Sequence, residues 1–161
     1  MRMRKDYIDS CIFLAHLFNE NNYCRDYINT IGYKNRNRGV ISHFVLSEIM
    51  INIITKIDYD DYLKGKILRE ECFENISETI IRLKYKKLLD ILKITSKILD
   101  KELYDKLIKS DTKLTEDDAL HIIEAIKSNC DFFVTIDKEI IANKKLREYL
   151  NQNHNLKIKE L

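Results

Sequence analysis

Hydrophobic and polar residues alternate along the chain with two different periods, which predict strands and helices in turn. Short runs rich in β-branched and aromatic residues predict strands at 6–10, 39–43, 89–94, 132–136 and 156–159. Apolar residues that recur every three or four positions predict helices at 12–18, 24–31, 45–57, 96–107, 116–128 and 138–150, with one or two more within 59–90. Strands that alternate with helices form parallel sheets, so the predicted fold class is α/β.

Two of these helices have the clearest patterns. Residues 115–118 have the composition of a capping box, in which Thr115 and Asp118 each accept a hydrogen bond from the other's backbone N–H. The side chains expected to be buried behind this box are Leu120, Ile122, Ile123 and Ile126. In the helix at 45–57, the repeat predicts one buried face that consists of Val45, Leu46, Ile49, Met50, Ile53, Ile54 and Ile57.

Length and composition indicate a single folded domain over residues 1–161. The 161 residues are 45% hydrophobic and 34% charged, which gives enough apolar side chain for a core and too much charge for a membrane protein. Lys and Arg (28) nearly balance Asp and Glu (26), which leaves a net charge of +2. Any nucleic-acid partner must therefore be held by a local basic patch.

The spacing of cysteines and histidines argues against a zinc site. None of the four cysteines forms a Cys-x-x-Cys pair and none of the four histidines has His-Glu-x-x-His spacing, so we expect reduced, buried thiols. The apolar run from Cys11 follows Asp6 and Asp9 and is interrupted by His16, unlike a secretion signal. No stretch approaches the ~20 apolar residues of a membrane span. The sequence therefore predicts a soluble, cytoplasmic protein without a membrane partner.

Acidic residues follow or flank the predicted strands. Asp9 and Ser10 end the first strand, and Asp137 directly follows the strand at 132–136. Asp118 opens the helix before that strand, and Glu48 lies in the first turns of the helix after the second strand. Because the carboxyl ends of parallel strands meet at one edge of a sheet, we expect these four carboxylates to lie close together.

Such a cluster is costly when it is empty, because two like charges 4 Å apart repel by about 4 kcal/mol at an effective dielectric constant of 20. A divalent cation offsets this repulsion. With oxygen ligands and no His or Cys expected in reach, the site suits Mg²⁺ or Mn²⁺. A metal held in this way supports hydrolysis of phosphodiester bonds, so the acids point to a nuclease.

Each acid also has a simpler structural explanation. Asp118 is the acidic end of the capping box, Asp137 is a candidate N-cap, and Glu48 alone would usually be a solvated helix residue. Asp117 adjoins Asp118 and is an alternative ligand. Asp9 is the hardest to explain without a function, because Asp is depleted in strands.

The segments that carry these acids resemble the signature segments of PIN-domain ribonucleases. They are Tyr7-Ile-Asp-Ser10, Ser47-Glu48, Asp118-Ala-Leu-His121 with Ala125, and Val134-Thr-Ile-Asp137, in the family's order. The resemblance implies one PIN-like domain over 1–161, a three-layer α/β/α sandwich around a central parallel sheet of four or five short strands. It also implies an Mg²⁺- or Mn²⁺-dependent endoribonuclease that cleaves single-stranded or structured RNA, often as a homodimer.

Small members of this family resemble VapC-type toxins, which an antitoxin protein holds inactive. The resemblance therefore also implies a toxin–antitoxin pair, although residues 59–114 match no motif of the family. Carried over by position, the metal-binding and catalytic acids would be Asp9, Glu48, Asp118 and Asp137. Ser10 and Thr135 would be supporting hydroxyls.

Two basic clusters are the candidate RNA contacts. They consist of Lys34, Arg36 and Arg38 before the second strand, and of Lys144, Lys145 and Arg147 after Asp137. Tyr33 beside the first cluster is a candidate for stacking on a base. The alternative for both clusters is a solvated surface, because Lys is common throughout the chain.

Two other functions remain open from the sequence. A non-catalytic PIN-like module that binds RNA or protein would share the fold, but it has no need of all four acids. A phosphotransfer receiver domain also uses clustered Asp with Mg²⁺, but the Asp-Ala-Leu-His helix has no role there.

Overall fold

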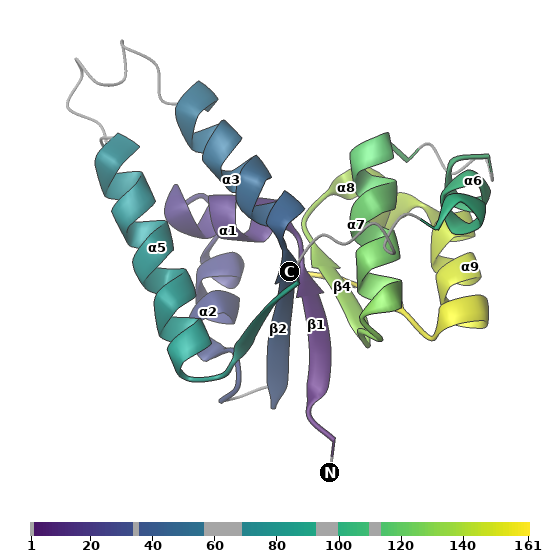
Figure 1. Ribbon diagram of the computed structural model, residues 1–161, viewed down its shortest axis with the longest axis horizontal. Helices are drawn as coiled ribbons and strands as arrows, with labels where there is room; N and C mark the ends of the chain where they lie inside the picture. The colour runs from purple at the N-terminus through teal and green to yellow at the C-terminus, as the bar shows by residue number, and fades with distance from the viewer. Residues whose placement is uncertain (1, 34–35, 57–68, 93–99, 110–113) are drawn as a thin grey trace.

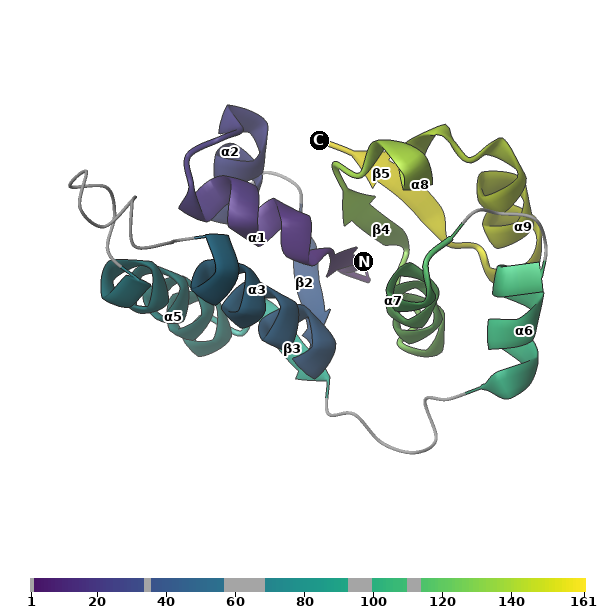
Figure 2. The same ribbon diagram turned by 90° about the horizontal axis from the view of Figure 1, so that it is seen from above.

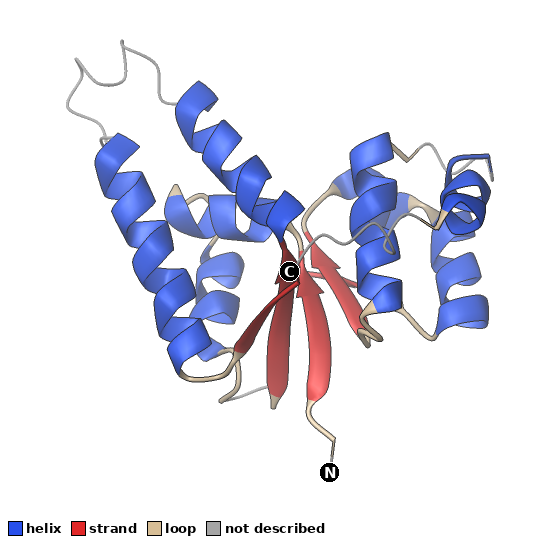
Figure 3. Cartoon of the chain, in the orientation of Figure 1, coloured by secondary structure: helices blue, strands red, loops and turns tan. Residues whose placement is uncertain are grey.

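A five-stranded, all-parallel sheet forms the centre of the molecule. The computed structural model describes residues 2–33, 36–56, 69–92, 100–109 and 114–161. The strand order is β3-β2-β1-β4-β5 (Figure 3). The strands are β1 (Arg4–Ile8), β2 (Asn37–Ser42), β3 (Leu89–Leu92), β4 (Phe132–Thr135) and β5 (Lys157–Glu160). All five predicted strands are present, and β1 begins and ends two residues earlier than predicted.

Helices cover both faces of this sheet and complete a three-layer α/β/α sandwich (Figures 1 and 2). One face carries α1 (Ser10–Leu17), α2 (Asn22–Thr30), α3 (His43–Lys56) and α5 (Arg69–Tyr85). The other carries α6 (Lys101–Lys109), α7 (Glu116–Lys127), α8 (Lys138–Ala142) and α9 (Lys144–His154). The predicted α/β fold class is confirmed. Among the described residues, no helix is both long enough and apolar enough to span a membrane.

The strand order places a topological switch at the centre of the sheet. The chain adds β2 and β3 on one side of β1, and then crosses back to add β4 and β5 on the other side. In open parallel sheets, ligands bind beyond the carboxyl ends of the strands at such a switch. Here those ends belong to β1 and β4, which Asp9 and Asp137 follow.

The helix predicted at 138–150 is two helices. Asn143 has φ −77° and ψ 90° and ends α8, and its side chain accepts a hydrogen bond from Leu146 N at 3.0 Å to begin α9. The break carries neither Gly nor Pro, so the helical spacing of apolar residues gave no sign of it.

The predicted buried face of α3 is wrong in part. Val45, Ile49 and Ile53 are buried, whereas Met50 and Ile54 are 52% and 50% exposed. The apolar stripe is wider than the surface that α1, α5 and β2 cover. Ile57, the first residues of the helix predicted at 96–107 and the end of the strand predicted at 89–94 lie outside the described residues.

The expected state of the cysteines agrees with the structure. All four lie in the described residues and are free; Cys24, Cys72 and Cys130 are buried and Cys11 is half-buried. Burial raises the pKa of the Cys130 thiol to about 12, which keeps it protonated.

A buried ion pair lies inside β1. The Asp6 carboxylate is fully buried and accepts two hydrogen bonds from the Arg4 guanidinium, both at 2.7 Å. Tyr27 Oη and Asn37 Nδ2 donate to the same carboxylate at 2.7 and 2.8 Å. Asp6 thus connects β1 with α2 and β2.

Candidate active site

Asp9 lies at the junction of β1 and α1. Its backbone has the extended conformation of an N-cap (φ −66°, ψ 151°), but its side chain makes no capping bond to α1. The carboxylate instead accepts a hydrogen bond from Thr135 Oγ1 at 2.6 Å, and Cys11 Sγ lies 3.1 Å from it. Asp9 is therefore held toward the end of β4 by a side chain from that strand.

Thr135 joins the ends of the two central strands. Its hydroxyl donates to Asp9 Oδ2 and accepts from the backbone N–H of Asp137 at 3.0 Å. Ser10, the second predicted hydroxyl, is buried with its Oγ 3.5 Å from Asp9 Oδ1. Both hydroxyls therefore lie beside the Asp9 carboxylate.

Glu48 reaches the same place from α3. Its side chain is 30% exposed, and Oε1 lies 3.0 Å from Nε2 of His121 on α7. Burial alone would raise the pKa of Glu48, but the hydrogen bond and charge of His121 outweigh it, so the pKa is lowered. Glu48 is thus neither freely solvated nor part of the apolar core.

Asp118 caps the start of α7 and also lies near the other acids. Thr115 accepts from Asp118 N at 3.1 Å, and Asp118 Oδ2 accepts from Thr115 N and Oγ1, so the predicted capping box is confirmed. Burial raises the pKa of Asp118, as do the charges of Asp137 and Asp9, against the Thr115 hydrogen bonds. The capping bonds use one carboxylate oxygen, and the side chain is close enough to the other acids to be affected by their charge.

Asp137 also caps a helix. Its Oδ1 accepts from the backbone N–H groups of Glu139 and Ile140 at 2.7 and 3.3 Å, which begins α8. Oδ2 takes no part in these bonds. Asp117 is exposed, and its charge contributes to the raised pKa of Tyr104 on the side of α6.

The expectation that neither His nor Cys lies in reach of the acids is wrong. His121 is buried beside Glu48, and Cys11 contacts Asp9. One ligand atom each from Asp9, Glu48 and His121 lie within 4.8 Å of one another. The sequence did contain a signal for His121: it follows Asp118 by three positions, so both side chains share one face of α7.

The donor atoms fit a divalent cation. Two carboxylates and one imidazole meet at the switch point, with two further acids beside them. Carboxylate oxygens suit Mg²⁺ and Mn²⁺, and imidazole is a common ligand of the later divalent metals. Asp9 and Glu48 are central to this group, whereas Asp118 and Asp137 each retain one oxygen that their helix caps do not use.

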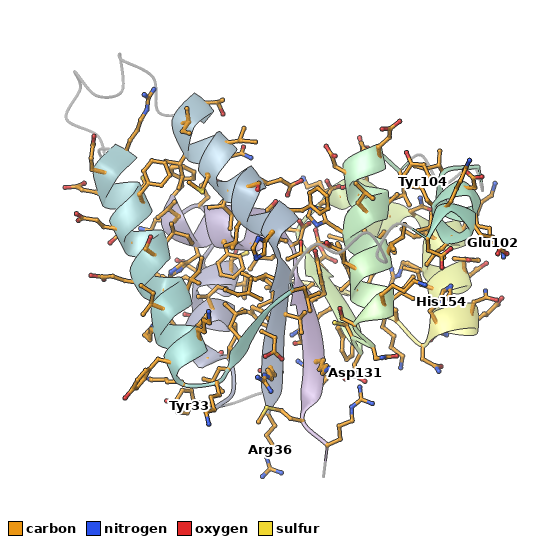
Figure 4. The ribbon with its side chains drawn as sticks, in the orientation of Figure 1. Tyr33, Arg36, Glu102, Tyr104, Asp131 and His154 are labelled. Atoms are coloured by element: carbon orange, nitrogen blue, oxygen red, sulfur yellow. The ribbon has the colours of Figure 1, made fainter. Side chains whose placement is uncertain are left out.

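The first basic cluster lies far from these acids. Arg36 and Tyr33 lie near the start of β2, at the opposite end of the sheet from the strand arrowheads (Figure 4). Arg38 is paired with Asp90 of β3. Lys34 lies outside the described residues.

The second basic cluster begins α9. Lys144, Lys145 and Arg147 are exposed there, shortly after Asp137 and α8. Because α9 follows the carboxyl end of β4 through the short helix α8, this cluster begins at the same end of the sheet as the acids.

Comparison with solved structures identifies the fold. VapBC from Salmonella typhimurium, solved bound to DNA, matches with a TM-score of 0.64 and 16% identity over 98% of both chains. VapBC2 from Rickettsia felis, bound to a DNA fragment from its promoter, matches with a TM-score of 0.61 and 15% identity over 97% of this chain and 98% of that one. VapC20 from Mycobacterium tuberculosis, a toxin that cleaves the sarcin–ricin loop, matches with a TM-score of 0.55 and 12% identity over 86% of this chain and 95% of that one.

The chain therefore has a PIN-domain fold of the VapC kind. No protein-family model matches the sequence, and neither does any curated protein. At 12–16% identity the likeness establishes the fold alone, so the activity must be argued from the site.

Proposed function

We propose that the protein is a metal-dependent endoribonuclease that cleaves single-stranded or structured RNA. The observation that carries this proposal is the meeting of Asp9 and Glu48 with His121 at the switch point, with Asp118 and Asp137 beside them. These acids come from four separate segments of the chain. A fold that needed only stability would not bring them together, because like charges repel.

The side chains would have different roles in this reaction. Asp9 and Glu48 would hold Mg²⁺ or Mn²⁺, and Asp118 and Asp137 would add negative charge and their unused oxygens to the same site. When bound, the metal lowers the pKa of a water molecule and stabilises the charge that develops on the phosphate. Thr135 keeps the Asp9 carboxylate in place through its 2.6 Å hydrogen bond.

The raised pKa of Asp118 favours an enzyme over a non-catalytic binding module. Burial is the main cause of this rise, and the charges of Asp137 and Asp9 add to it, so the cluster carries an electrostatic cost when no cation is present. A module that only binds RNA or protein gains nothing from this cost. A bound divalent cation removes it.

The fold neighbours support a toxin within this class. Two were solved as VapBC complexes on DNA, and a third is named as a toxin that cleaves an RNA loop. We extend this to the present chain as an RNase toxin with an antitoxin protein as its partner, acting as a homodimer. Of the predicted RNA contacts, Lys144, Lys145 and Arg147 are the ones that follow Asp137 and α8 directly, so we place the substrate backbone there.

The proposal is tested by cleavage of a mixed pool of RNAs with Mg²⁺, Mn²⁺ or EDTA. Wild-type protein should cleave only with metal, and Asp118→Asn should lose at least about 100-fold of this activity, as expected when a group that acts in the transition state is removed. Asp117→Asn is the matched control, because it makes the same change one residue away at an exposed position. It should retain wild-type activity.

Three results would contradict the proposal in different ways. Equal losses in both variants would show that the effect is not specific to the site. Cleavage that persists in EDTA would exclude the metal. Folded protein that neither cleaves RNA nor binds metal would favour the binding module.

The partners need separate tests. An antitoxin predicts a small neighbouring reading frame whose product co-purifies with this chain and suppresses its cleavage of RNA. A homodimer predicts twice the chain's 19.2 kDa in size-exclusion chromatography with light scattering.

A further inference from the structure

The buried histidine of α7 has a place in the site that a PIN-like set of four acids does not account for. His121 is 3% exposed and lies three residues after Asp118. Its Nε2 faces the Glu48 carboxylate at 3.0 Å and belongs to the same group of ligand atoms as Asp9. The ring therefore lies among the carboxylates.

A chain of buried hydrogen bonds fixes the orientation of the ring. Nδ1 of His121 is 2.9 Å from the hydroxyl of Tyr7, which donates to Glu124 and also contacts Ser42 Oγ at 3.0 Å. Because the Tyr7 proton goes to Glu124, Nδ1 must be the donor to Tyr7. Nε2 is then the ring nitrogen that faces the carboxylates. Without metal it donates its proton to Glu48 Oε1, so a bound metal would have to displace this proton.

Aromatic contacts hold the residues of this hydrogen-bond chain in place. Tyr7 stacks on Phe133 of β4 with ring centroids 5.6 Å apart and an interplanar angle of 9°. Phe44 of α3 meets the His121 ring edge-on at 6.5 Å. Histidines that bind metals usually donate their second ring N–H to a fixed acceptor in this manner, which sets the tautomer and the ring direction. Oε2 of Glu124 accepts the Tyr7 proton and lies 3.9 Å from Nδ1 of His121, whereas its Oε1 has no hydrogen-bond partner within the described part of the chain.

The three ligand atoms lie within 4.8 Å of one another, and one of their distances equals that between neighbouring ligands of a single cation. Neighbouring ligands of an octahedral ion that each lie about 2.1 Å from the metal are about 3 Å apart. Nε2 of His121 and Oε1 of Glu48 are separated by 3.0 Å. We propose that His121 Nε2 is a direct metal ligand together with Asp9 and Glu48, and that the site is a mixed nitrogen–oxygen site that prefers Mn²⁺ to Mg²⁺.

This inference rests on the proposed function, since it names the ligands of the same site. Its chemical consequence is selectivity. Mg²⁺ favours all-oxygen coordination and keeps several waters, whereas an imidazole ligand favours the later divalent metals. Replacing this nitrogen by an oxygen donor should therefore change the preference between metals more than it changes the total affinity.

The test is electron spin-echo spectroscopy of Mn²⁺ bound to the full chain. A directly bound imidazole gives ¹⁴N modulation of the Mn²⁺ signal, and the modulation changes when only the histidine rings carry ¹⁵N. His121→Gln should abolish it and should lower the ratio of Mn²⁺ to Mg²⁺ affinity by about tenfold, measured by titration. His43→Gln is the matched control, because His43 is exposed at the start of α3, and it should keep both the modulation and the ratio.

The outcomes separate this inference from the proposed function. Bound Mn²⁺ without histidine modulation in the wild type overturns the inference and leaves the nuclease proposal intact. Modulation that survives in folded His121→Gln also overturns it, because another histidine is then the ligand. No binding of either metal overturns both proposals. If His121→Gln does not fold, the isotope change in the wild-type protein still decides whether a histidine binds the metal, and its absence overturns the inference.

Discussion

Two buried aspartates, three residues apart, lie in very different surroundings. Asp6 lies inside β1 and Asp9 lies just after its end. Both are buried, at 0% and 8% exposure. They differ in what surrounds them.

Asp6 is surrounded by donors from this chain. Arg4 binds both of its oxygens, and Tyr27 and Asn37 add two more hydrogen bonds. The Arg4 guanidinium neutralises the Asp6 charge, and both carboxylate oxygens accept hydrogen bonds. Breaking such a pair by removing one partner is costly, because the other charge is left buried.

Asp9 has fewer donors and more acids nearby. Thr135 gives it one short hydrogen bond, Cys11 and Ser10 lie at longer distances, and its charge raises the pKa of Asp118. Within the described residues, no Lys or Arg forms an ion pair with it. A structural carboxylate is satisfied by the protein, whereas this one has capacity for a ligand that the chain does not supply.

The largest expected effect comes from breaking the Asp6 pair. Arg4→Met leaves the Asp6 charge buried and should lower the free energy of unfolding by about 3 kcal/mol. Urea denaturation measures it. The control Arg2→Met alters an exposed arginine that lies 3.9 Å from Asp131, and should cost less than about 0.5 kcal/mol. Equal losses would mean that the Arg4 pair does not differ from a surface contact.

The second largest effect is stabilisation by Mn²⁺, which should depend on Asp9. Mn²⁺ at about 100 times its dissociation constant should raise the free energy of unfolding by about 2.7 kcal/mol, because it binds only the folded state. Asp9→Asn should fold normally and show no such rise, as a melting curve with and without Mn²⁺ will report. Asp26→Asn, an equal charge change on the exposed surface of α2, should respond as the wild type does. Loss of folding in Asp9→Asn would make Asp9 structural, like Asp6.

The smallest effect is a dependence of stability on pH. Burial and the charges of Asp137 and Asp9 raise the pKa of Asp118 in the folded state, so the folded protein binds this proton more tightly than the unfolded chain does. The stability that this proton contributes is present below the ordinary pKa of Asp and is lost as pH rises through the folded pKa. Asp118→Asn removes the charge and keeps an oxygen that can accept from Thr115. Without metal, the variant should therefore be more stable than the wild type by about 0.5 kcal/mol at pH 7. At pH 3, where Asp118 of the wild type is protonated, the two proteins should be equally stable.

Urea denaturation across this pH range measures the difference. Asp117→Asn, which changes an exposed carboxylate, should show no difference of this kind. A stability gain that did not depend on pH would assign the effect to helix capping instead of charge repulsion.

The sequence alone determined the order and type of the elements. Period-two and period-3.6 patterns depend on local geometry, so they located all five strands and the capping box of α7. The same logic placed Asp9, Glu48, Asp118 and Asp137 at strand ends and helix starts. It failed at Asn143, where α8 ends without Gly or Pro, and on α3, where α1, α5 and β2 cover only part of the apolar stripe.

Only the tertiary structure decided which polar side chains share the site. Tyr7, Ser42, His121 and Glu124 come from β1, β2 and α7, and no local pattern relates a tyrosine on a strand to a histidine 114 positions later. Spacing along the chain predicted no histidine near the acids, because it carries no information on contacts between distant segments. Three-dimensional packing brought His121 next to Glu48, because α3 and α7 both meet the carboxyl edge of the sheet. Residue types set which chemistry is possible, and the strand order set which residues meet to perform it.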